Sequence, residues 1–157
     1  MRFTLIKDIK EDKTMSLILK GFLVFILLFL IADILVMNSS FGISIQKINI
    51  TLFGNEDEYI DPITQSSFLE FWHTQIFFIM MILLSLSAIF IRVAKRSRVI
   101  IINILMISAI ISLIALPMSF YVTSVFITIY ATTYFLWHIT AMWMILYSYW
   151  KLNAKNI

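Results

Sequence analysis

The sequence of 157 residues contains no cysteine, two prolines, three glycines and two histidines. Without cysteine the chain can form no disulfide, no thiolate metal site and no catalytic thiol. So few glycines and prolines leave little material for phosphate-binding loops or for the broken helices of transporters. Charged residues are scarce as well, at 13% of the chain, whereas a typical soluble domain has about 25%.

Hydrophobic residues, by contrast, make up 61% of the sequence and aromatic residues 15%. A core of this size cannot hide so many apolar side chains, and so few charges cannot cover its surface. The composition therefore predicts an integral membrane protein. It argues against a water-soluble globule, a disordered chain and a nucleic-acid-binding protein.

Four apolar blocks have the length of about 20 residues that a bilayer requires. They cover residues 17–37, 68–93, 99–121 and 125–150. In hydrocarbon an isolated segment satisfies its backbone polar groups only as a helix. We therefore predict an all-α fold, in which residues 1–157 form a single four-helix transmembrane bundle. The first block is too long for the core of a cleaved signal peptide and no small-residue cleavage site follows, so we expect a retained anchor.

The positions of lysine and arginine predict the orientation. Every basic residue except Lys47 falls before or at the start of the first block, at the end of the second block or in the link to the third, or in the C-terminal tail. Four crossings place these three segments on one side, which the positive-inside bias makes cytoplasmic, with both termini inside. The other side carries Lys47 and the acids Glu56, Asp57, Glu58, Asp61 and Glu70. The expected location is the cytoplasmic (inner) membrane of a bacterium.

An outward loop of about thirty residues, 38–67, joins the first two blocks. Its apolar residues alternate as in a β-hairpin, but Phe41, Ile45, Ile48 and Leu52 also fit a helix lying on the bilayer surface, which we favour. The sequence Ser67–Phe–Leu–Glu70 matches a capping box, which predicts that the second spanning helix begins at Ser67.

Asp33, Glu70 and His73 form one candidate site near the outer membrane surface. Asp33 lies about 6 Å inside the end of the first block, and His73 about 9 Å beyond the predicted cap. Glu70 and His73 share a helix face in an E-x-x-H pair. A mononuclear metal site from these three residues is one interpretation. The other is an acid bonded to the headgroups or a neighbouring helix, a capping glutamate and an interfacial histidine.

His138 is the second candidate, near the bilayer midplane, with Tyr130, Tyr134, Ala141 and Tyr149 close to one face of its helix. A neutral histidine can bind haem iron, bond a quinone carbonyl or pass a proton, with Tyr134 beside it. It can also simply bond a facing side chain and hold two helices together. A predicted depth of about 20 Å for His138 disfavours a haem shared with His73, although a later start of the last helix would reduce the mismatch.

Three functions remain open on the sequence. The first is a non-catalytic subunit, anchor or assembly partner of a larger membrane complex, since no catalytic motif is found. A stripe of small residues suits close helix packing in such a complex: Ser108, Ser112, Ala115 and Ser119. The second is a redox subunit that binds b-type haem or quinone through His138, and through His73 in one version. The third is a small carrier or channel. The expected partners are the lipid bilayer and a membrane protein or further copies of this chain.

Overall fold

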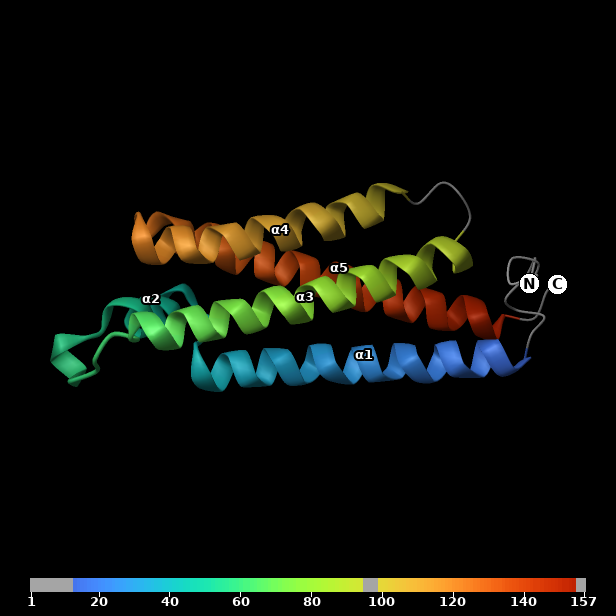
Figure 1. The fold of residues 1–157 in the computed structure, drawn as a ribbon, viewed down its shortest axis with the longest axis horizontal. Helices are drawn as coiled ribbons and strands as arrows, with labels where there is room; N and C mark the ends of the chain where they lie inside the picture. Colours follow the sequence, from blue (N-terminus) through green and yellow to red (C-terminus); the bar gives the residue numbers. More distant parts are fainter. Residues whose placement is uncertain (1–12, 95–98, 155–157) are drawn as a thin grey trace.

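The computed structural model describes residues 13–94 and 99–154 of the chain. Its elements, in chain order, are α1 (Lys13–Ser40), α2 (Ile45–Phe53), the 3-10 turn η1 (Glu56–Glu58), α3 (Gln65–Val93), α4 (Val99–Tyr121) and α5 (Val125–Asn153). The four long helices run side by side (Figure 1), and each is long and apolar enough to cross a membrane. No β-strand occurs in these residues, and the predicted all-α membrane bundle is confirmed.

The helix boundaries agree with the predicted blocks most closely in α4, which covers the expected residues. The start of α3 is wrong by about one turn, because the N-cap is Thr64 and not Ser67. The Thr64 hydroxyl oxygen accepts from the Ser67 backbone N–H at 3.2 Å. Threonine is also a favoured N-cap residue, so the helix gains about one turn at its outer end.

The centre of the bundle is α5, which packs against all three other spanning helices. Its most extensive contact is with α4. There the predicted stripe of small residues is buried: Ser108, Ser112, Ala115 and Ser119. Small side chains let two helix backbones approach closely in a membrane. The prediction that this stripe is a packing face is therefore confirmed.

The short helix α2 closes the outer end of the bundle, where α1 stops before α3, α4 and α5 do (Figure 1). Ser44 caps it by accepting from the Lys47 backbone N–H. The predicted helix in the loop is confirmed, but its environment differs from the expected bilayer surface. Phe41, Ile48 and Leu52 are buried in a cluster with residues of α1, α3, α4 and α5. Burial against protein removes this apolar face from the bilayer.

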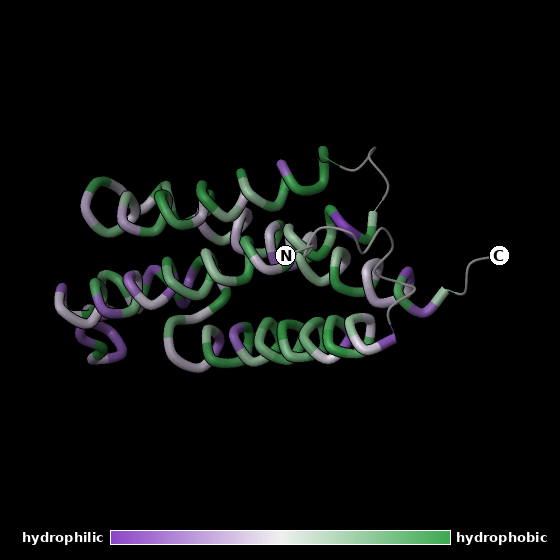
Figure 2. Tube along the Cα trace, turned by 45° about the vertical axis from the view of Figure 1, so that its right-hand side comes forward, coloured by the Kyte–Doolittle hydropathy of each residue, from purple (hydrophilic) through white to green (hydrophobic). Residues whose placement is uncertain are grey.

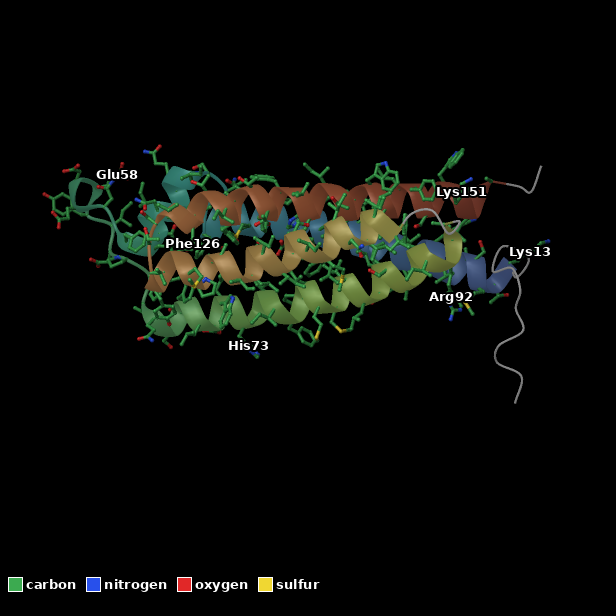
Figure 3. The ribbon with its side chains drawn as sticks, turned by 90° about the horizontal axis from the view of Figure 1, so that it is seen from above. Lys13, Glu58, His73, Arg92, Phe126 and Lys151 are labelled. Atoms are coloured by element: carbon green, nitrogen blue, oxygen red, sulfur yellow. The ribbon has the colours of Figure 1, made fainter. Side chains whose placement is uncertain are left out.

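Charged residues are concentrated at the two ends of the bundle, whereas Asp33 lies between them. Lys13, Arg92 and Lys151 lie at one end and Glu58 at the other (Figure 3). Figure 2 shows mostly hydrophobic helices and a hydrophilic segment at the end that carries η1. Exposed large hydrophobic side chains line all four spanning helices, as expected for contact with lipid. Lys20 lies in α1, and the other basic residues of the orientation argument lie outside the described residues: Arg2, Lys7, Lys10, Lys95, Arg96, Arg98 and Lys155.

Candidate functional site

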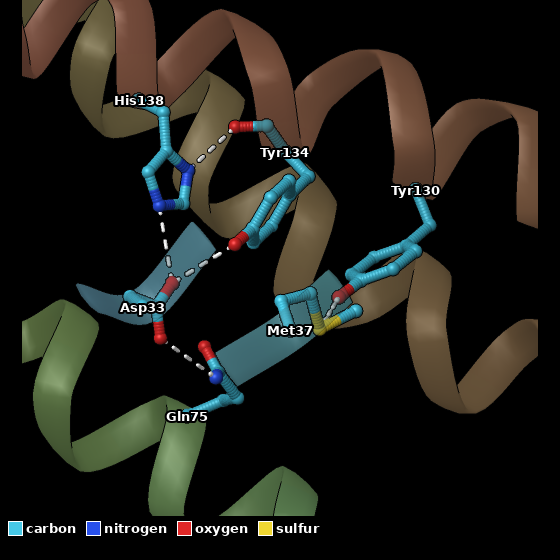
Figure 4. A network of polar contacts seen from close by, with 6 residues as sticks. All are labelled: Asp33, Met37, Gln75, Tyr130, Tyr134 and His138. Atoms are coloured by element: carbon cyan, nitrogen blue, oxygen red, sulfur yellow. Dashed lines mark hydrogen bonds and ion pairs between the residues drawn. The ribbon is translucent and has the colours of Figure 1, made fainter. Parts of the chain in front are cut away.

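A polar network inside the bundle joins α1, α3 and α5 around the carboxylate of Asp33 (Figure 4). His138 Nε2 lies 3.1 Å from Asp33 Oδ2. The Tyr134 hydroxyl donates to the same oxygen at 3.0 Å, and the Gln75 amide donates to Oδ1 at 3.3 Å. Both carboxylate oxygens therefore accept hydrogen bonds from other helices.

Helical spacing places these groups opposite one another. On α5, Tyr130, Tyr134 and His138 follow at intervals of one turn and so share a face. On α1, Met37 lies one turn after Asp33 and faces Tyr130 on α5. The Tyr130 hydroxyl donates to Met37 Sδ at 3.8 Å. Polar contacts at successive turns of both helices thus hold α1 against α5.

The network is almost closed to its surroundings. His138 is 1% exposed and the Asp33 side chain 11%. The Trp137 and Tyr134 rings lie against the imidazole, with centroids 3.8 Å and 4.2 Å from its own. A charge in such an apolar environment is costly unless it is paired and hydrogen-bonded.

The hydrogen bonds of His138 fix how many protons the site holds. Nδ1 lies 2.9 Å from the Tyr134 backbone carbonyl oxygen, which only accepts, so Nδ1 carries a proton. The bond between Nε2 and the Asp33 carboxyl needs one more proton, on one partner or the other. In both cases the pair has no net charge. The site therefore holds a shared proton in a form that an apolar interior tolerates.

His73 lies close in sequence to Gln75, a member of this network, but on the opposite side of α3. It precedes Gln75 by two residues, which is about 3 Å along the axis and about 200° around it. Gln75 points inward to Asp33, whereas His73 is exposed and points away from the bundle (Figure 3). Direction therefore separates the His73 side chain from His138.

The structure does not bring together the three residues of the candidate metal site. Glu70 and His73 are exposed on α3, whereas Asp33 faces α5 and bonds His138. Within residues 13–94 and 99–154, no group of three metal-ligating side chains is close enough to hold an ion. Asp33 is instead engaged with a neighbouring helix, which was the alternative interpretation of this residue.

The histidines do not fit a haem held between α3 and α5. An axial ligand needs a free nitrogen lone pair, and both ring nitrogens of His138 are engaged with protein atoms. His73 faces outward from the bundle. Tyr134, proposed as a cofactor contact, donates its hydroxyl to Asp33. Haem binding in this arrangement would require the network to open.

The sequence analysis did not predict three members of the network: Gln75, Met37 and, as a bonding partner, Tyr130. A signal for the main pair was nevertheless present. Asp33 and His138 both fall inside apolar blocks, and intramembrane ionisable groups usually pair with one another. Tyr149, predicted on the His138 face, is 40% exposed, and Ser148 is buried instead.

The comparisons with known proteins give one family. A family model described as a transmembrane helical domain, Aq_1264_TM, matches residues 42–156. The match covers α2 to α5, and it therefore includes Gln75, Tyr134 and His138 but not Asp33. No curated protein and no solved structure matches the chain.

Proposed function

The chain belongs to this family of transmembrane helical domains, and from that premise we propose that it is a non-catalytic, multi-pass subunit, anchor or assembly partner of a larger membrane complex. The host is the cytoplasmic membrane of a bacterium, with the Lys13, Arg92 and Lys151 end in the cytoplasm. Positive charge at one end of the bundle supports that orientation.

The observation that carries this proposal is the complete engagement of the His138–Asp33 pair. Each ring nitrogen and each carboxylate oxygen has a partner within the protein. A group prepared to bind a ligand keeps a free donor or acceptor directed to an open space. This pair instead joins α1 to α5, and Gln75 adds α3, so the polar centre supports a role in holding the helices in one arrangement.

The alternative is a redox subunit that binds haem b or quinone through His138. It requires the Nε2–Asp33 bond to break and the Trp137 and Tyr134 rings to move from the imidazole. No specific observation favours it, and the burial of His138 argues against access by a quinone ring.

The test is the mass and colour of the protein extracted from its native membrane into lipid nanodiscs. Light scattering should give a stoichiometric assembly heavier than the 18.4 kDa chain, and the visible spectrum should have no Soret band. A lone 18.4 kDa chain would contradict the assembly role. A Soret band lost in His138→Ala but kept in His73→Ala would establish the redox alternative.

A further inference from the structure

The outward face of α4 differs from the lipid-facing surfaces of the other spanning helices. It is almost entirely isoleucine, and its central residues recur every seven positions: Ile100, Ile107 and Ile114. These side chains are 70%, 57% and 57% exposed. Ile104 and Ile111 flank them on one side, and Asn103 and Ile110 on the other. Seven residues make about two helical turns, so these isoleucines lie in one line along the helix, here called the seam. Helices that pack side by side carry repeats of this kind.

Asn103 is the one polar side chain in this face. It is exposed and lies four residues, about 6 Å, after the start of α4. Its side-chain amide makes no hydrogen bond within the part of the chain that the structure describes. A helix whose remaining surface is apolar gains nothing from an unpaired amide in lipid, whereas an amide bonded across two helices stabilises their association.

The position of α4 leaves this seam accessible. The helix packs on α5 through its small-residue face, and it lies at the edge of the bundle on the side away from α1 (Figure 1). Isoleucine side chains are β-branched and already restricted at χ1, so they lose little freedom when they pack against another helix. The seam is therefore available to a neighbour and well suited to one.

We propose that a second copy of this chain covers the seam, so that two α4 helices pair in parallel about a two-fold axis in the membrane. All copies insert with the same orientation, so each residue of the seam meets its own counterpart across the axis. The Asn103 amide both donates and accepts, which makes it self-complementary in that arrangement. The proposal rests on the assembly role proposed above and names the partner.

The absence of cysteine gives a direct test by oxidative cross-linking in native membranes. Ile100→Cys, Ile107→Cys and Ile114→Cys are the seam variants. Leu84→Cys on α3 and Ile139→Cys on α5 are matched controls, since these residues are 62% and 63% exposed. The seam variants should form disulfide-linked dimers several-fold faster than the controls. Equal rates at all five positions, or no dimer at the seam, would overturn the proposal.

A second measurement uses the self-association constant of variants in nanodiscs or dilute detergent. Asn103→Leu should weaken the dimer about 3- to 30-fold, the range expected for one polar bond between membrane helices. Asn103→Gln, which keeps the amide, should retain most of the affinity. Equal affinities for wild type and Asn103→Leu would remove the amide from the interface and contradict the proposal.

The two proposals fail in different ways. A heavy assembly that contains a different membrane protein, without cross-linking through α4, contradicts the dimer but leaves the assembly role intact. A single chain in nanodiscs together with no cross-linking contradicts both. Lipid is then the occupant of the seam.

Discussion

His138 Nε2 lies 3.1 Å from Asp33 Oδ2 although 105 residues separate them in the chain. The bond connects α1 to α5, and Tyr134 and Gln75 donate further hydrogen bonds to the carboxylate. Removing Asp33 leaves His138, Tyr134 and Gln75 without their acceptor, whereas removing His138 leaves the carboxyl without its basic partner. Both consequences can be measured.

Replacing Asp33 by leucine should destabilise the bundle. The change removes the acceptor for His138, Tyr134 and Gln75, and a buried polar group left without a partner costs about 1–3 kcal/mol. Unfolding of purified protein in a mixed-detergent titration, followed by circular dichroism, measures the loss. Leu35→Ala on the exposed face of α1 is the control and should change the free energy of unfolding by less than about 0.5 kcal/mol.

The pair should also be coupled in a double-mutant cycle. Asp33→Leu combined with His138→Leu should be less destabilising than the sum of the single changes, by about 0.5–3 kcal/mol. Two apolar side chains of similar volume leave no charge to be paired. Strict additivity of the two changes would show that the bond contributes nothing to the fold.

The turn between α1 and α2 should require glycine at position 42. Gly42 has φ +93, and a Cβ there would lie 2.5 Å from Lys47 Cβ. Gly42→Ala should cost at least about 1–2 kcal/mol from the left-handed backbone alone. Gly21→Ala is the control, because that helical position has nothing within 4 Å and alanine there should be neutral or stabilising by up to about 1 kcal/mol. Thermal unfolding of the two variants compares them, and equal transitions would contradict the prediction.

The contact between α4 and α5 should not accept a larger side chain. Ala109 is 0% exposed, so Ala109→Leu should push the helices apart and cost about 1–3 kcal/mol. Ala88→Leu makes the same chemical change at an exposed position of α3 and should be tolerated. The detergent titration described for Asp33 serves here too, and comparable losses in both variants would be evidence against close packing at Ala109.

The orientation in the membrane should follow the charged ends. Glu58→Cys and Lys13→Cys each place one thiol in a chain that has none, at opposite ends of the bundle (Figure 3). A membrane-impermeant maleimide added to intact cells should label Glu58→Cys, and it should label Lys13→Cys only after permeabilisation. The reverse pattern would invert the topology.

The spanning helices could be predicted because bilayer thickness and backbone hydrogen bonding leave few alternatives for an apolar segment of that length. The pairing of Asp33 with His138 could not be predicted from depths counted from the helix ends. Asp33 lies about 10 Å from the end of α1 and His138 about 20 Å from the start of α5. The two residues nevertheless meet, because α1 stops short and α2 fills the space beyond it.

The direction of His73 depends on a neighbour rather than on its own position. Helical geometry puts residues two apart on opposite sides, so His73 and Gln75 cannot both face the bundle. The sequence does not indicate which of the two faces the bundle, since both side chains are polar and both lie within three residues of Trp72. Packing decides it, because the amide of Gln75 has a carboxylate to bond on α1.

The separation of Asp33 and His138 along the chain has a consequence during synthesis. At about 5–20 residues per second, a ribosome completes Gln75 about 2–8 s after Asp33. It completes His138 about 5–20 s after Asp33. The acid is made well before its base exists. The Gln75 amide of α3 is therefore made before the other two groups that bond Asp33, and the His138 imidazole is made only with α5.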